Sequence, residues 1–467
     1  MVRQKVKFVL SDLHLGAAYG RKDDNQLESF SVDNEFIYFL NSIVRESERD
    51  WQEVELIING NFLDFLQVPA LKETGVMEAH PIEAYPDSSE AASIKRLNLI
   101  HQAHYGVFEA LSNFMQSTSP QRRLTIIKGN HDVHFYWPRV KSRLRELLNA
   151  SGGRSSLLLF AEEFVSREKI YIEHGHQRAE PINRYSDFHI PFLPRNPSQL
   201  DYPVGSRLII ELSQQMNLKP HLAPITTLLW YALQWDLKLA AKLLTKLFQN
   251  KPIRAMNMAS VAKTASLNGD VPSLDDQPFQ SEAETYQLLQ QAALDKYLRR
   301  KIYHQIQIHL NLTDQKNGLP PFDIDEANDN PVLIAQAEQQ HYRHSVCRTA
   351  EVIAQREGAQ IVLFGHTHYA CQEILEDETI YVNTGCWVED LSDAAPEIWS
   401  DIFANGYQPN RPLSLPYARI DYDETNIPTV QLLDFANSLP ADDTSNRSGL
   451  SQKVFDWLNR WRSDHRF

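Results

Sequence analysis

Short apolar runs that end in polar residues recur along the first 180 residues and again near residue 360. Each run has four to six residues rich in Val, Ile, Leu or Phe, and the sequences that follow are SDLH, NGN, KGNHD, EHGH and GHTH. Apolar runs of this length are typical of strands buried on both faces of a sheet. They predict five strands, at 5–10, 54–58, 124–127, 169–172 and 360–364.

Helical spacing of apolar residues separates several of these runs. The spacing over 36–44 predicts an amphipathic helix, and two further stretches, 93–116 and 341–357, have the same character. Strands that alternate with helices predict an α/β fold whose functional groups lie on loops at strand ends. Four more strands are predicted toward the C-terminus, at 372–375, 379–382, 417–422 and 429–433.

The stretch 181–340 departs from this alternation. It begins with five prolines spread over 181–203 and continues as strongly helical sequence. Its end, 311–331, is rich in Asn, Asp, Pro and Gly, which is typical of a loop. We therefore predict three parts, which are a core at 1–180 and 341–435, a mostly helical insertion or cap at 181–340, and a polar tail with a short helix at 436–467.

Composition narrows the class of protein. The chain has 46 basic and 60 acidic residues, and its formal charge of −14 counts against a nonspecific nucleic-acid binder. Its three cysteines have no paired spacing, which indicates reduced thiols in a reducing compartment. The first residues lack the apolar stretch of a signal peptide, and no apolar run is long enough to span a membrane. We therefore expect a cytoplasmic protein.

The polar residues that follow the five apolar runs are Asp, Asn and His. Imidazole, carboxylate and amide oxygen together suit Mn²⁺, Fe or Zn²⁺, whereas Ca²⁺ prefers oxygen ligands alone. A single cluster of this kind often only caps a turn or a strand end. Five such clusters, each after a predicted strand, indicate a metal site.

The order of these clusters resembles the calcineurin-like metallophosphoesterase superfamily, whose motifs are D-x-H, G-D, G-N-H-D, H and G-H-x-H. The resemblance covers about 1–180 and 341–390. The variants SDLHLG, HGH and NTGCW are most similar to bacterial UDP-2,3-diacylglucosamine pyrophosphatases, although those enzymes lack so long an insertion. The resemblance implies an α/β fold in the form of a four-layer α/β/β/α sandwich, here with a large, mostly helical insertion.

The resemblance also implies a centre of two divalent metal ions, with Mn²⁺ as the first expectation and Fe, Zn²⁺ or Mg²⁺ as alternatives. The first ion would be held by Asp12, His14 and His368, and the second by Asn130, His174 and His366. The carboxylate of Asp12 would also reach toward the second ion. Outside both sets, His131 would face the phosphate as an acid or electrostatic stabiliser, and Asp132 would orient it.

Position 61 departs from the family, because the ligand that bridges the two ions is expected to be Asp and this chain has Asn61. Asp64 matches a second acid of that motif but is not ordinarily the bridge. An amide oxygen is neutral, and its NH₂ group would be repelled by two cations. Two explanations stay open. Either Asn61 is an inactivating substitution in an otherwise active enzyme, which we favour because the other ligands are present, or it is native and the protein is slow, single-metal or a phosphate-binding pseudoenzyme.

A basic helix is predicted in the insertion. Lysines at 238, 242 and 246 recur every four residues opposite an apolar side. The segment 222–254 is therefore either a peripheral contact with an anionic membrane or a cap helix packed on its neighbours with a solvated lysine face. We favour the packed helix.

We therefore expect a metal-dependent hydrolase of phosphate esters or diphosphates that uses metal-activated water. Its substrate would be a phosphorylated small molecule or a lipid-linked diphosphate, and its location would be cytoplasmic, with membrane contact as an alternative. Candidate substrate contacts are His134, Arg139 and Arg184. The rival hypotheses are a phosphate-binding regulatory pseudoenzyme and a nuclease of the same superfamily, against which the acidic charge counts.

Overall fold

The computed structural model describes residues 5–17, 28–70, 86–161, 163–213, 223–249, 279–310, 327, 329–406 and 414–439. The chain divides into two compact units. The first comprises Met1–His174, Ala354–Val388 and Pro412–Phe467, and the second comprises Gly175–Ile353 and Glu389–Arg411. Residues 389–411, which the sequence placed in the core, thus belong to the second unit. The helix predicted within 436–467 lies outside the described residues, apart from 436–439.

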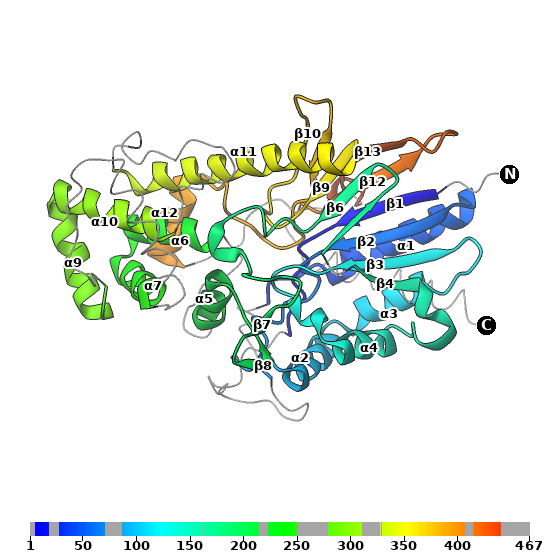
Figure 1. Ribbon diagram of the computed structural model, residues 1–467, viewed down its shortest axis with the longest axis horizontal. Coiled ribbons are helices and arrows are strands. Elements are labelled where there is room, and N and C mark those ends of the chain that lie inside the picture. The colour runs from blue at the N-terminus through cyan, green and yellow to red at the C-terminus, as the bar shows by residue number, and fades with distance from the viewer. Residues whose placement is uncertain are drawn as a thin grey trace. The chain divides into compact units, whose positions relative to one another are not determined.

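Two sheets form the first unit (Figure 1). The six-stranded sheet has the order β13-β12-β1-β2-β3-β4, in which β1 to β4 run parallel and β12 and β13 pair antiparallel. Its strands are β1 (Lys5–Leu10), β2 (Glu53–Asn59), β3 (Arg122–Ile127), β4 (Leu158–Ala161), β12 (Pro416–Tyr422) and β13 (Pro428–Asp434). Strands form at all five of the short apolar runs, three of them in this sheet and two in the second sheet, and the α/β class is confirmed.

The five-stranded sheet has the order β10-β11-β9-β6-β5, with β11, β9 and β6 parallel and antiparallel strands at both edges. Its strands are β5 (Phe164–Arg167), β6 (Ile170–Glu173), β9 (Ile361–Phe364), β10 (Cys371–Ile374) and β11 (Ile380–Asn383). The short strands β4 and β5 were not predicted; β4 is an apolar run of only four residues, LLFA, and β5 has the mixed sequence FVSR.

One apolar cluster joins the two sheets, with Ile57 from the first and Leu363 from the second among its members. Because side chains alternate along a strand, Glu55 and Asn59 of β2 point to the same face as Ile57. Glu55 forms a buried ion pair with Nζ of Lys7 at 2.8 Å, and Asn59 donates a hydrogen bond to the carbonyl oxygen of Glu173. The space between the sheets is therefore polar at both ends and apolar in the middle.

Four α-helices of the first unit lie beside the six-stranded sheet (Figure 1). They are α1 (Asp33–Asp50), α2 (Glu90–Ala103), α3 (Tyr105–Phe114) and α4 (Pro138–Leu147). The apolar side of α1 is buried, as its spacing predicted, and Phe36 packs edge-on against the buried Trp387. The helical stretch predicted at 93–116 is two helices, separated at His104. Short 3₁₀ turns cover Val133–Tyr136, Gly152–Leu157 and Phe435–Ser438.

The second unit is mostly helical and has its own apolar core, in which Trp230, Leu244 and Trp399 are fully buried. Its helices are α5 (Val204–Ser213), α6 (Ile225–Trp235), α7 (Leu237–Gln249), α9 (Glu282–Leu294), α10 (Lys296–His309), α12 (Pro396–Asn405) and most of α11 (Pro331–Glu357). It also contains a 3₁₀ turn at Pro181–Asn183 and the hairpin of β7 (Phe192–Leu193) and β8 (Asn196–Leu200).

The basic helix predicted from its lysines is α7. Its apolar residues, including Leu244 and Leu247, belong to the core of the second unit, whereas Lys238 is exposed. The apolar side of α7 is therefore occupied by its own unit; residues 250–254 of the predicted segment lie outside the described part. Among the described helices, none is long and apolar enough to cross a membrane.

A charged histidine, His104, stabilises the position of the loop that follows β1. His104 Nδ1 lies 2.8 Å from Oδ1 of Asp33, and its Nε2 lies 3.4 Å from Oε2 of Glu28. Glu28 in turn accepts a hydrogen bond from the backbone N–H of Gly16. Burial opposes the charged imidazole, but the hydrogen bonds to Asp33 and Glu28 outweigh it and raise the pKa of His104 to about 9. Two carboxylates and one imidazolium thus hold this loop against α1 and α2.

The raised pKa predicts a specific pH dependence of stability. Since the pKa of His104 rises from 6.5 to about 9 on folding, its stabilising charge is fully present below pH 6.5 and is lost as the pH rises through 9. We expect His104→Gln to lower the free energy of unfolding by about 2–3 kcal/mol at pH 6 and by clearly less at pH 10, measured by urea titration.

The matched control is His101→Gln, three residues earlier in the last turn of α2. Burial and Arg143 lower the pKa of His101, so its charged form does not stabilise the fold. The effect of His101→Gln should therefore not be larger at pH 6 than at pH 10. An equal loss at both pH values for His104→Gln would contradict the charged imidazole.

Candidate metal centre

The strand ends of the two sheets bring the predicted ligands together. Because parallel strands present their carboxyl ends at one edge of a sheet, the loops that follow them can meet there. The ligands follow their strands in this way: Asp12 and His14 after β1, Asn61 after β2, Asn130 after β3, His174 after β6, and His366 and His368 after β9. Backbone hydrogen bonds join the first two loops, from Asp12 N to Gly60 O and from His14 N to Asn61 O.

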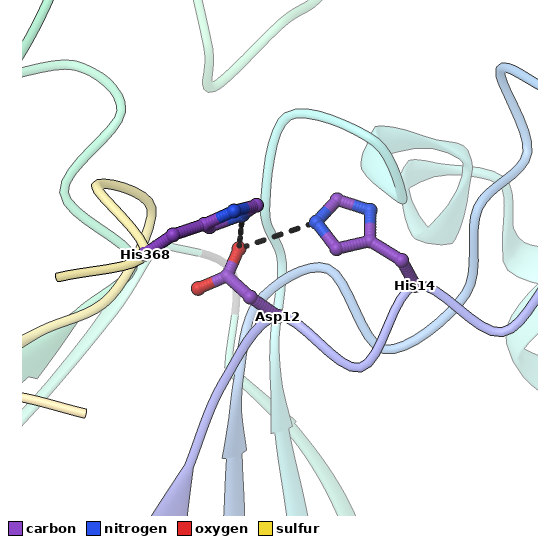
Figure 2. Close-up of side chains that lie close together, drawn as sticks. All are labelled: Asp12, His14 and His368. Carbon is purple, nitrogen blue, oxygen red and sulfur yellow. Dashed lines mark ion pairs between the residues drawn. The ribbon is translucent and has the colours of Figure 1, made fainter. Parts of the chain in front are cut away.

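One carboxylate oxygen is the meeting point of three histidines. Figure 2 shows the rings of His14 and His368 directed at the same oxygen of Asp12; both Nε2 atoms lie 3.5 Å from Oδ1. The Nε2 atom of His174 lies 3.8 Å from that oxygen. Asp12, His14 and His368 offer ligand atoms within 4.8 Å of one another, which is compatible with a single cation. The set predicted for the first ion is therefore assembled.

The set predicted for the second ion is assembled beside it. Nε2 of His174 lies 3.1 Å from Oδ1 of Asn130, and the rings of His174 and His366 are 5.3 Å apart between centroids. Nδ1 of His174 is 2.8 Å from the carbonyl oxygen of Asn59, which can only accept, so Nδ1 carries the proton and Nε2 is an acceptor. Two acceptors therefore face each other at 3.1 Å, and a cation between them would stabilise both. The donor set fits a transition metal ion.

Burial and mutual charge set the protonation of the centre. Burial opposes the charge of Asp12, but His174, His14 and His368 outweigh it and hold the pKa of this carboxyl well below its usual value. For His14, the hydrogen bonds to Asp12 and Asp64 outweigh burial and raise the pKa. Burial lowers the pKa of His174 to about 3. The carboxylate is charged and His174 is neutral, which are the forms that bind a metal ion.

Backbone strain is concentrated at this site. Twelve described residues other than glycine have a positive φ, and five of them belong to the predicted ligand set: Asp12, His14, Asn61, His366 and His368. Only asparagine and aspartate adopt this conformation at low cost. Three histidines that adopt a positive φ are therefore held in that conformation by the surrounding structure. Such backbone strain is typical of functional sites.

Gly60 permits the close approach of His174. Its φ is +83°, and a Cβ added there would lie 2.3 Å from His174 Nδ1. Gly152 has a φ of +60° and open space around it, so Gly152→Ala tests backbone strain alone, at about 1–2 kcal/mol. We expect Gly60→Ala to lower the free energy of unfolding by about 3 kcal/mol or more, in urea unfolding. Equal losses in the two variants would contradict the contact with His174.

The carboxylate that orients His131 is Asp64, so the prediction of Asp132 for this position is corrected. His131 Nδ1 lies 3.1 Å from Oδ1 of Asp64, whose Oδ2 lies 3.3 Å from Nδ1 of His14. The carboxylate of Asp132 instead points to the backbone, where it accepts hydrogen bonds from the N–H groups of Phe62 and Gly129. Burial raises the pKa of Asp132 to about 7, although these N–H groups favour its charged form. Asp132 shapes the loops, and Asp64 holds two imidazoles.

The predicted substrate contacts differ in their local environments. His134 is buried, with its ring stacked on Phe65 at 4.4 Å. Arg139 is exposed at the start of α4, where its backbone N–H bonds Glu90. Arg184 belongs to the second unit, where it donates to the carbonyl oxygen of Ala179. None of the contacts described for these three side chains involves a predicted metal ligand.

The two carboxylates beside His131 predict different phenotypes. We expect Asp64→Asn to weaken Mn²⁺ binding by about 10–100-fold, because His14 loses the group that fixes its ring. Asp132→Asn places an NH₂ group against a backbone N–H, so we expect mainly a lower melting temperature. Calorimetric titration with Mn²⁺ and thermal unfolding of the metal-free protein separate the two effects. Weak binding in Asp132→Asn with unchanged binding in Asp64→Asn would contradict this division.

No protein-family model matches the chain, and no curated protein matches it either.

Proposed function

We propose that the chain is a metal-dependent hydrolase of phosphate esters or diphosphates, of the metallophosphoesterase type. The observation that carries the proposal is the convergence of three Nε2 atoms, from His14, His174 and His368, on one buried carboxylate oxygen of Asp12. These residues come from three loops that are distant in sequence. Because their side chains are polar, their convergence does not help to build an apolar core. A four-layer α/β/β/α core is part of the proposal, supported by two sheets that share one apolar cluster and by helices beside the first.

The ions would be held by two sets, Asp12, His14 and His368 for the first, and Asn130, His174 and His366 for the second. Divalent ions in such a centre lower the pKa of bound water and stabilise charge on phosphate oxygens. Arg and Lys side chains take no part in the described hydrogen bonds of either set, so the positive charge that a phosphate needs would come from the ions. The neutral and anionic groups of the chain supply the ligands.

His131 is the chain's own group for proton transfer. Burial lowers its pKa, and Asp64 acts in the opposite direction. Its Nδ1 faces the acceptor Asp64, so Nδ1 carries a proton, and the other ring nitrogen, Nε2, is the one that would act on a substrate. As an imidazolium, with a second proton on Nε2, His131 would bind a phosphate oxygen or donate that proton to the leaving group. The carboxylate of Asp64 holds the ring in that orientation and stabilises the charged form.

Asn61 favours a second candidate, a phosphate-binding protein with little turnover. Its Nδ2 lies 2.9 Å from Oδ1 of Asp12 and 3.2 Å from Oδ1 of Asn130. An NH₂ group, rather than a bridging oxygen, thus stands between the two ligand sets. In that case the pocket would bind metal and phosphate and leave ester bonds intact.

Replacement of Asn61 distinguishes the two candidates. We expect Asn61→Asp to raise the hydrolysis of an aryl phosphodiester in Mn²⁺ by about 100-fold or more, because a charged oxygen replaces an NH₂ group between the ions. The measurement is a panel of phosphomonoester, phosphodiester and pyrophosphate substrates with both proteins.

Asn149→Asp is the matched control, because Asn149 also has a positive φ and an amide that donates a hydrogen bond, to Ser112. It should leave the rates unchanged. Phosphate and metal binding without any gain in turnover in Asn61→Asp would favour the binding protein. No metal binding by either protein would overturn both candidates.

A further inference from the structure

The orientation of the Asn61 amide is fixed by its three partners. Its Oδ1 accepts a hydrogen bond from the backbone N–H of His131 at 2.9 Å. Its Nδ2 donates to Oδ1 of Asp12 at 2.9 Å and to Oδ1 of Asn130 at 3.2 Å. An asparagine amide offers two hydrogens and one acceptor oxygen, and all of these are used here.

The opposite orientation of the amide is strongly disfavoured. A flip would bring NH₂ against the N–H of His131 and Oδ1 against the oxygen of Asp12, so that donors would face donors and acceptors would face acceptors. The side chain also has no room to swing aside, because Gly129 packs on it so closely that a Cβ there would lie 2.4 Å from Asn61 Oδ1. Asn61 is itself buried, with 1% of its surface exposed.

The amide hydrogens connect the two ligand sets. Asp12 belongs to the first set and Asn130 to the second, and their oxygens would otherwise be neighbouring acceptors in a buried site. A carboxylate at position 61 would keep the bond from His131 N–H and turn its second oxygen toward both of them. Three acceptors, two of them charged, would then face one another, and only a cation would stabilise that arrangement.

We propose that the Asn61 amide takes the place of a cation between the two ligand sets, keeping the site assembled without metal and disfavouring the second ion. This inference rests on the proposed function and specifies how many ions its site takes. In the second set, the single amide oxygen of Asn130 already receives a hydrogen from Asn61. The first set contains the only carboxylate of the two sets, Asp12, whose negative charge favours a cation there. The chain therefore takes one ion, at Asp12, His14 and His368.

The test compares the full-length chain with Asn61→Asp by calorimetric titration with Mn²⁺, metal analysis after dialysis, and thermal unfolding in a chelator. We expect one Mn²⁺ in the unchanged chain and two in Asn61→Asp, with the second ion bound about 100-fold more tightly. In the chelator, Asn61→Asp should melt about 5 °C or more below the unchanged chain. In Mn²⁺ this order should reverse. The opposite signs separate the inference from a general loss of stability.

Asn149→Asp is again the control, with one ion and an unchanged melting temperature expected. Two ions bound with similar affinity by the unchanged chain, or an unchanged melting temperature of Asn61→Asp in the chelator, would overturn the inference and leave the proposed function standing. If neither protein binds Mn²⁺ nor hydrolyses any substrate, the proposed function fails and the inference fails with it.

Asn61→Ala serves if Asn61→Asp does not fold, because it removes the amide hydrogens without adding a charge. We expect a lower melting temperature in the chelator together with tighter binding of a second Mn²⁺. If neither change occurs, the amide does not act in place of a cation.

Discussion

The buried carboxylate of Asp12 is the group around which the first unit is arranged. A buried charge is strongly destabilising unless it is paired and hydrogen-bonded. Asp12 is fully buried, and besides three imidazoles and the amide of Asn61 it accepts the backbone N–H of His366 through Oδ2 at 2.8 Å. Its own carbonyl oxygen accepts from Trp387 N. Stabilising this one charge therefore requires the loops after β1, β2, β6 and β9 to meet, which fixes the two sheets relative to each other.

The scaffold keeps these loops in place by confining charge to the two ends of the space between the sheets. At the end away from the site, Lys7 lies within 3.1 Å of both Glu55 and Glu168, and Tyr422 donates to Glu168. Apolar residues of both sheets fill the middle layer. A close-packed layer of this kind is hardly compressible, so it supports the strand ends that carry the predicted ligands. The strained backbone of His366 and His368 can persist only on such a support.

One carboxylate, that of Asp64, links ion binding to proton transfer in the proposed enzyme. Asp64 contacts His14, a predicted ligand, and His131, the proposed proton donor. Any shift of one ring changes the hydrogen bond that the same carboxylate offers to the other. Asn61 has a comparable place between the two ligand sets, and its neutral amide decides how much negative charge the centre holds. The chemistry of the site thus depends on two side chains near the end of β2, three residues apart.

The sequence by itself determined the strands that follow the apolar runs, the helix at 36–44 and the positions of the predicted ligands at strand ends, because apolar periodicity is a local property of the chain. It also revealed Asn61, since a departure from a motif is visible without coordinates. Only the tertiary structure decided that Asp64 rather than Asp132 faces His131. Asp132 is adjacent to His131 in sequence, but its carboxylate accepts hydrogen bonds from backbone N–H groups. The carboxylate that faces His131 belongs to Asp64, which is 67 residues away in sequence. Partners of this kind depend on how distant loops fold over one another, and no local pattern records that.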